Sequence, residues 1–318
     1  MPEQRSKRIN LSDDEKLKQV NPDTLKLMRK YEADMTLREL APTTVYGYKQ
    51  DLKQWFIWIL ENQDNQCVAD LNDDDIEDFL FFCKQEGNHT ERMKRRMAAI
   101  SAFYKYLRKK KLIESNPMEF IDRPKKGSAI VIQTYLTPEQ VELMRAKLDE
   151  YGDLQLKTYA LFSLSTMARV NAIANLRWEQ IDFEARECKD VLEKERRIVE
   201  LSFSQEVKDL LLALKEERED KGIDDYGWVF YSRYNTATKP INNGTLLEWC
   251  KKIGSMIDVP TLHPHDFRHS GATILKNKGM SLEDISELLH HLGTDVTSKF
   301  YIKKDTSKIK ALKDQFSF

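Results

Sequence analysis

The sequence has few cysteines, no long apolar run and almost no net charge. Cys67, Cys83, Cys188 and Cys250 lie far apart and form no Cys-x-x-Cys pair. This spacing argues against a disulfide scaffold or a cysteine-rich zinc site and favours a reducing compartment. No apolar stretch approaches the roughly 20 residues needed to cross a bilayer, and the opening MPEQRSKRIN has no secretory signal pattern. We therefore expect a cytoplasmic protein without a membrane segment.

The near-neutral total hides an uneven distribution of charge. The 318 residues contain 51 Lys and Arg and 52 Asp and Glu, which gives a formal net charge of −1. Eight acids and no base lie between Glu61 and Asp78, whereas nine bases and no acid lie between Arg92 and Lys111. The basic stretch could be only a solvated face, but it favours contact with DNA phosphates. The residues expected to bind DNA are Arg92, Lys94, Arg95, Arg96, Lys105 and Arg108.

Hydrophobic spacing predicts four helices before residue 120. They fall at about 25–35, after the Ala41-Pro42-Thr43 turn, after the acidic stretch and at about 91–110. In the fourth, apolar residues at 93, 97, 100, 103, 104 and 107 would face inward and the nine bases outward. Residues 121–134 combine Pro, Lys, Gly and Ser without periodicity, as is typical of a linker.

A second domain is predicted to follow this linker. Thr137-Pro138-Glu139-Gln140 has the pattern of a capping box and should begin a helix. Alternation within 187–203 predicts a strand, the second arm of a hairpin. Further helices are expected at 155–165, 170–177, 205–218, 244–256, 266–278 and 282–291, with a last one containing Tyr301. The predicted organisation is an N-terminal extension (1–24), a helical domain (25–120), the linker (121–134) and a second domain (135–318).

Five of the six histidines lie between His263 and His291, where the chemistry is concentrated. The densest segment runs from His263 to Ser270 and reads HPHDFRHS. His265 and His269 are spaced i,i+4 and could bind a metal, but the glutamate of a zincin motif is missing. No metal and no cofactor are therefore expected. Taken alone, Tyr301 beside Phe300 would be expected to pack in a core.

Four boxes in order resemble the tyrosine recombinase, or phage integrase, family. They are Thr166-Met-Ala-Arg169 with Leu176-Arg-Trp178, then His265-Asp-Phe-Arg-His-Ser270, Leu288-Leu-His-His291 and Tyr301. The resemblance covers roughly residues 25–305. It implies a mainly α fold with a small β-hairpin or sheet. The N-terminal helical domain would be a core-binding, SAM-like domain, and the C-terminal domain an α/β catalytic domain.

The resemblance also implies roles for individual residues. In this family a tyrosine attacks a DNA phosphodiester through a transition state with extra negative charge, which two arginines can hold bidentately. Tyr301 would be the nucleophile. Arg169 and Arg268 would hold the phosphate, His265 would assist deprotonation, His291 would donate a hydrogen bond and Lys194 would protonate the leaving oxygen. The alternative to Lys194 is Lys189, because the hairpin lacks the usual Gly turn.

Several residues depart from the family pattern and keep a second function open. Met167 and His290 stand where the family has Gly, and Ala172 stands where it has an acid that orients its neighbours. A recombinase-fold transcriptional regulator, such as a phage repressor, is the alternative to a recombinase that integrates, excises or resolves DNA.

The implied partners are double-stranded DNA and other copies of the chain. A recombinase would act as a tetramer on DNA, whereas a dimer would suit the regulator. The sequence does not decide whether an accessory protein takes part. The tail after Tyr301 has Ile309, Leu312 and Phe316 at helical spacing, and we expect it to pack against a neighbouring subunit. A bacterial or phage protein associated with the nucleoid is implied.

Overall fold

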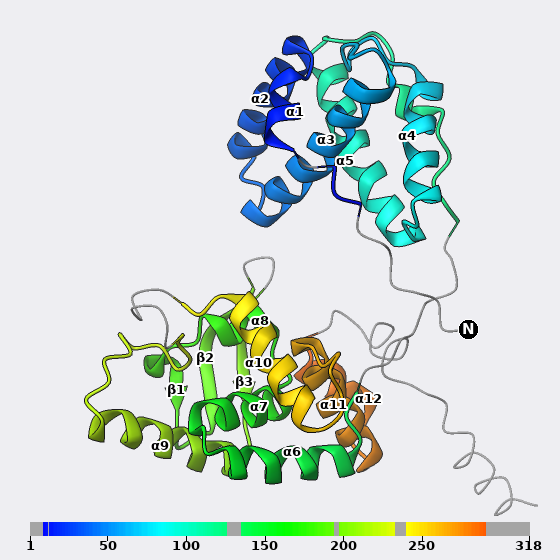
Figure 1. Ribbon diagram of the computed structural model, residues 1–318. Helices are drawn as coiled ribbons and strands as arrows, with labels where there is room; N and C mark the ends of the chain where they lie inside the picture. Colours follow the sequence, from blue (N-terminus) through cyan, green and yellow to red (C-terminus); the bar gives the residue numbers. More distant parts are fainter. Residues whose placement is uncertain (1–8, 12, 126–134, 194–196, 233–239, 291–318) are drawn as a thin grey trace, which may run out of the picture. The chain divides into compact units, whose positions relative to one another are not determined.

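The computed structural model describes residues 9–11, 13–125, 135–193, 197–232 and 240–290. The chain divides into two compact units, Met1–Ile130 and Val131–Phe318. Within the described ranges the protein is mainly helical with one small sheet (Figure 1). This confirms the predicted fold class.

The N-terminal unit is a bundle of helices. Its elements are α1 (Asp14–Gln19), α2 (Pro22–Leu37), α3 (Pro42–Asn62), α4 (Asp73–Gln85), α5 (Thr90–Lys109) and the 3-10 turn η1 (Pro117–Glu119). The four predicted helices are confirmed as α2 to α5, while α1 lies in the segment that was expected to be an extension. Asn72 and Asp75 form a capping box at the start of α4, so the acids of its first turn lie at the positive end of the helix dipole.

Aromatic side chains fill the core of this bundle. The Trp55 ring on α3 lies 5.8 Å from the Tyr104 ring on α5 and 6.5 Å from the Phe79 ring on α4. All six apolar residues expected on the inner side of α5 are buried. Tyr104 also donates a 2.9 Å hydrogen bond to the Val68 carbonyl, so its buried hydroxyl has a partner.

The C-terminal unit is built around α7. Its elements are α6 (Pro138–Tyr151), α7 (Leu154–Thr166), α8 (Val170–Ala174), the 3-10 turn η2 (Trp178–Gln180), β1 (Ile181–Asp182), β2 (Glu187–Leu192), β3 (Ile198–Ser202), α9 (Gln205–Asp220), α10 (Asn243–Met256), α11 (Pro264–Asn277) and α12 (Leu282–Leu288). Helix α7 contacts α6, α9, α11 and β3 (Figure 1), which explains why nine of its 13 residues are buried. The predicted capping box of α6 is confirmed.

The sheet is antiparallel with the order β1-β2-β3. Glu187 pairs with Ser202 and Leu192 with Ile198, and the register shifts between Cys188 and Val191. The predicted hairpin is therefore confirmed. The predicted helix at 170–177 is shorter than expected, because α8 ends at Ala174 and the chain then turns into η2.

Candidate functional site

Arg268 is held at the centre of the candidate site by α11. His263 caps this helix: its side chain accepts from the His265 amide, and Asp266 accepts from the His263 amide at 2.7 Å. The Arg268 side chain is buried, and it donates at 2.5 Å to the Met167 carbonyl and also to the Leu289 carbonyl. A guanidinium has five N–H donors in a rigid fork. Two backbone carbonyls from separate segments therefore fix its orientation.

Both carbonyls lie at corners of the chain with left-handed backbone. Met167 ends α7 with φ of 53°, and His290, which follows Leu289, has φ of 50°. These are the two positions where the resemblance leads one to expect glycine, and glycine adopts positive φ without a steric cost. The glycine positions of the family pattern are therefore positions of positive φ, and this chain adopts that φ with a methionine and a histidine.

Arg169 lies two residues beyond the first corner, at the N-terminus of α8. It forms an ion pair with Glu193, which follows β2 and whose side chain is fully buried, whereas the Arg169 side chain is 28% exposed. A buried carboxylate needs a positive partner, because desolvation of an unpaired charge is costly. Sequence patterns did not indicate Glu193 as a site residue.

Two histidines, His265 and His290, have lowered pKa values. Partial desolvation lowers the pKa of His265, and electrostatic interactions with His263, Arg268 and Arg169 lower it further. Desolvation and Arg268 likewise lower the pKa of His290. A neutral imidazole can accept a proton. Geometry relates the three residues: Arg268 donates to the Met167 carbonyl, two residues before Arg169, and His265 lies one turn before Arg268 at the start of α11.

Three of the predicted catalytic residues, Lys194, His291 and Tyr301, lie outside the described residues. The alternative to Lys194, Lys189, is on β2 and forms a 2.7 Å ion pair with Asp182. It lines a hollow with Asn175, Arg177 and other residues, and none of Arg169, His265 and Arg268 lines that hollow. This position does not associate Lys189 with the arginine site.

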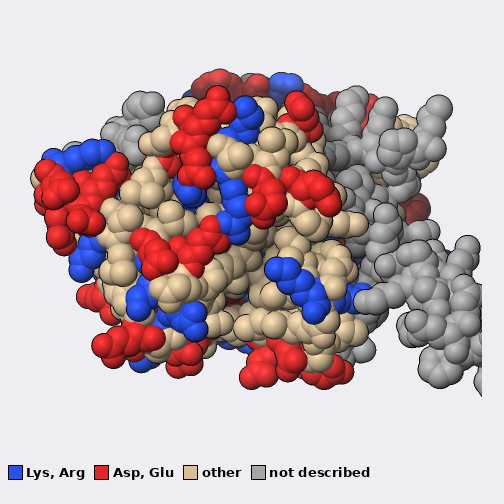
Figure 2. Space-filling view, turned by 90° about the horizontal axis from the view of Figure 1, so that it is seen from below, with Lys and Arg blue, Asp and Glu red and all other residues tan. Residues whose placement is uncertain are grey.

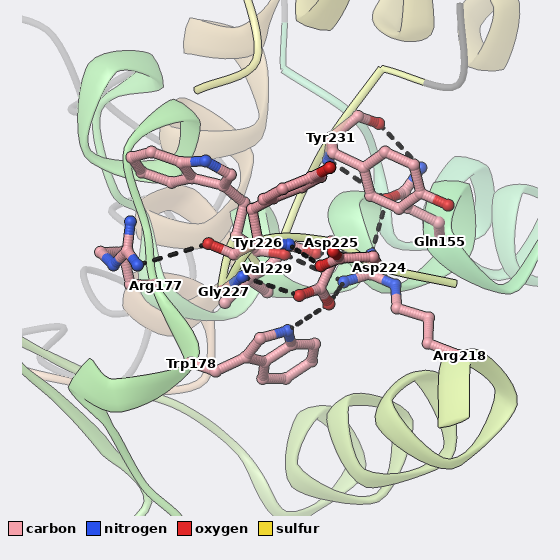
Figure 3. A network of polar contacts seen from close by, with 11 residues as sticks. Gln155, Arg177, Trp178, Arg218, Asp224, Asp225, Tyr226, Gly227, Val229 and Tyr231 are labelled. Atoms are coloured by element: carbon pink, nitrogen blue, oxygen red, sulfur yellow. Dashed lines mark hydrogen bonds and ion pairs between the residues drawn. The ribbon is translucent and has the colours of Figure 1, made fainter. Parts of the chain in front are cut away.

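The Leu176-Arg177-Trp178 box has a structural role. The Trp178 indole donates a 2.7 Å hydrogen bond to Asp225 (Figure 3). Asp225 also pairs with Arg218 of α9, whose guanidinium is buried and lies 5.4 Å from the Trp178 ring centre. Arg218 further donates to Gln155 of α7 and to the Trp228 and Val229 carbonyls. The network connects η2 to α7 and α9 behind the sheet.

One face of the C-terminal unit carries balanced charge. Figure 2 views the molecule from the side of α6 and α9, and acids and bases alternate there without a basic patch. Contacts within α6 include ion pairs of Arg145 with Glu142 and of Lys147 with Glu150. This face does not have the charge expected for binding phosphates.

The basic helix α5 divides into paired, exposed and buried residues. Arg92 and Arg95 both pair with the buried Asp51 of α3, and Arg95 remains 59% exposed. The other expected DNA-binding residues are distributed as follows: Lys94 pairs with Glu91, Arg108 pairs with Glu119, and Lys105 is exposed.

The prediction that all nine bases face outward is wrong for Arg96. Its side chain is buried, and it donates to Asn88 at 2.8 Å and to Gln54 at 3.1 Å. Its guanidinium also lies 5.6 Å from the centre of the Phe79 ring. Arg96 therefore belongs to the core of the bundle and is not available to DNA.

Among the described residues, no group of three or more His, Cys, Asp or Glu could hold a metal ion. Across the same ranges, no helix is both long and apolar enough to cross a bilayer.

Comparison with known proteins extends these observations to most of the chain. Residues 134–308 match the phage integrase family, and residues 29–111 match its N-terminal SAM-like domain. A tyrosine recombinase from Pseudothermotoga lettingae is 26% identical over 286 residues, which cover 87% of this chain and 93% of that protein. Tyrosine recombinase XerC from Herpetosiphon aurantiacus is 27% identical over 265 residues, covering 82% and 84%.

Solved structures share the fold at low sequence identity. A lambda integrase dimer bound to a COC′ core site matches with a TM-score of 0.68 and 16% identity, over 88% of this chain and 95% of that one. The Tn1549 transposon integrase in complex with transposon right-end DNA matches with a TM-score of 0.65 and 18% identity, over 91% and 98%. The ordered motifs, the two-unit fold and the family matches agree: the chain belongs to the phage integrase family of tyrosine recombinases, which break and rejoin DNA strands.

Proposed function

We propose that this chain is an active recombinase and that Tyr301 forms a 3′-phosphotyrosyl intermediate. The Tyr301 oxygen bonds to the phosphorus of a DNA phosphodiester as the bond to the 5′ oxygen breaks. His265 takes the phenol proton, and Lys194 gives a proton to the leaving 5′ oxygen. Because the phosphotyrosine keeps the energy of the broken ester, rejoining is the same exchange in reverse and needs no nucleotide.

The observation that supports this proposal most directly is the fixed position of Arg268, which is bound to the carbonyl of Met167 two residues before Arg169. Arg268 is tied to the Met167 and Leu289 carbonyls, and Arg169 retains an exposed fraction of 28%. Two oriented guanidinium groups can stabilise the extra negative charge of a pentacoordinate phosphorus without moving during the reaction. His291 would add a hydrogen bond to the same phosphate.

A nicked suicide DNA substrate that carries the native site tests this proposal. The wild-type protein should form a covalent adduct with the DNA, and Tyr301→Phe should bind the DNA with the same affinity but form none. Tight, specific binding by the wild-type protein without any adduct would instead support the transcriptional regulator. The absence of an acid at the buried Ala172 is the observation that favours this second function.

We also propose that α5 and its neighbours contact the DNA backbone through Arg92, Lys94, Arg95, Lys105 and Arg108. The proposed boundaries are a domain at 25–120 joined by the linker at 121–134 to a domain at 135–318, with both domains on the duplex. A plot of the logarithm of the binding constant against the logarithm of the salt concentration has a steeper slope when more phosphates are contacted. Removal of one phosphate contact should reduce this slope by about one. Lys105→Gln should therefore weaken binding equally on all DNA sequences and reduce that slope.

We propose that copies of the chain assemble on DNA through the tail after Tyr301. The assembly would be a tetramer during recombination, and it would form on the nucleoid in the cytoplasm. A groove next to β3 and α12 contains Glu187, Glu200, Asp284 and Glu287 together with apolar side chains such as Ile198. The tail carries three lysines between positions 308 and 313 and the apolar residues 309, 312 and 316. The acidic groove and the lysine-bearing tail therefore have complementary charges. Deletion of residues 306–318 should abolish oligomers on DNA, and unchanged assembly would contradict this role.

A further inference from the structure

The family's orienting acid is missing from α8 in this chain. Ala172 occupies its position and is fully buried in the hydrophobic core of the C-terminal unit. Helix α8 reads VNAIA, so it offers no carboxylate to Arg169. Some other group must compensate the charge of Arg169 and fix its direction if the arginine is to meet a phosphate.

Glu193 supplies a carboxylate from a different element. It follows β2 on the hairpin, and its amide donates at 2.8 Å to the Arg197 carbonyl. One carboxylate oxygen, Oε2, accepts from Nη1 of Arg169. The other, Oε1, is buried and has no hydrogen-bond partner within the described ranges. The sequence places Lys194 next to it.

We propose that Glu193 is a positioning residue for Arg169 and takes over the function of the acid that is missing at position 172. The proposal rests on the recombinase activity proposed above. The Glu193 side chain is fully buried, while Arg169 keeps a solvent-accessible part. The carboxylate therefore approaches the guanidinium from the protein side. The ion pair also links the segment just after β2, one residue before Lys194 in the sequence, to α8.

The opposite reading is that Glu193 competes with the phosphate and inhibits the site. The two readings predict opposite signs when the charge is removed. If Glu193 positions Arg169, loss of the carboxylate leaves a misdirected guanidinium and slows cleavage. If it competes, its loss frees Arg169 and accelerates cleavage.

The experiment measures the rate of adduct formation at saturating suicide substrate for Glu193→Gln, Glu193→Asp and Asp190→Asn. DNA affinity is measured for the same variants in the Tyr301→Phe background. Glu193→Gln should slow cleavage on the order of 100-fold with unchanged affinity. Glu193→Asp keeps the charge but shortens the side chain, so its rate should lie below that of the wild-type protein and at least ten times above that of Glu193→Gln. Asp190→Asn removes an exposed carboxylate from β2 and should cleave like the wild-type protein.

Each outcome decides the proposal. An unchanged or faster rate for Glu193→Gln overturns it, as does a parallel loss of rate and affinity. If Glu193→Gln is unfolded at the assay temperature, Glu193→Asp carries the test, and a rate equal to that of the wild-type protein would count against positioning. Absence of an adduct from the wild-type protein itself contradicts the recombinase activity and is thereby distinguished from failure of the inference.

Discussion

Both units bury arginine side chains, and Arg96 of the N-terminal unit is held differently from Arg268 of the C-terminal unit. In the N-terminal unit, Arg96 lies among the neutral amides of Asn88 and Gln54 inside a helical bundle. In the C-terminal unit, Arg268 is held by backbone carbonyls at the ends of α7 and α12. Burial alone therefore does not identify a functional arginine. Arg268 differs from Arg96 because backbone carbonyls at the ends of α7 and α12 orient its guanidinium in a site that contains a second arginine and a neutral histidine.

Replacement of Arg96 and of Arg268 should separate activity from stability, and this is the largest expected effect. Arg268→Lys keeps a charge but loses the fork that bridges the two carbonyls. Adduct formation should fall by about 10²- to 10³-fold, as when one preorganised donor to a transition state is lost. Arg96→Met should lower the melting temperature and leave the cleavage rate per folded molecule unchanged. A large effect of Arg96→Met on that rate would remove the contrast between the units.

Removal of one partner of the Arg169–Glu193 pair should cost more stability than removal of both charges. Arg169→Ala leaves a buried carboxylate without its partner, which costs about 3 kcal/mol. In the double variant Arg169→Ala/Glu193→Gln no charge is left uncompensated, so part of this loss should be recovered. Denaturant unfolding of the four proteins measures the coupling. Additive losses would show that the two side chains do not interact in solution.

The left-handed corners should respond differently to glycine. Met167 is buried against Ala272, Ile285 and Leu289, so Met167→Gly loses apolar packing of about 2 kcal/mol or more, while relief of the positive φ returns about 1 kcal/mol. His290 has a less buried side chain, and His290→Gly should be neutral or slightly stabilising. Thermal unfolding compares the two variants, and equal destabilisation by both would contradict the proposed difference.

The sequence predicted most helices and the hairpin because their apolar spacing and caps are local. It missed α1 and β1, which are too short to form a pattern. The burial of Arg96 had a local signal, since position 96 lies one turn before the inward-facing Ile100 on α5. Its partners on α3 and before α5 could not be deduced, because they depend on helix packing.

The motif identified Arg169, His265 and Arg268 from the sequence. It did not indicate the groups that hold these side chains in place. The Arg268 carbonyl partners come from Met167 and Leu289, which are 101 and 21 residues away in the chain. Backbone carbonyls have no side-chain identity that a sequence pattern can detect. Glu193 left a weak signal: it is an acid next to the candidate Lys194 in a chain that lacks the acid at position 172. Only the fold connects it to Arg169.

The smallest expected effect is a loss of stability at low pH. The histidines of the C-terminal unit should contribute to this loss. Desolvation, with electrostatic interactions with His265 and Arg268, lowers the pKa of His269 to about 4. Its pKa in an unfolded chain is about 6.5, so between these values the unfolded state binds more protons. The stabilisation is present above pH 6.5 and is lost as the pH falls toward 4. The melting temperature of the wild-type protein should therefore fall more steeply over this range than that of His269→Asn. Since His265 and His290 titrate in the same direction, the single substitution should remove only part of the slope, and an unchanged slope would exclude His269 as a contributor.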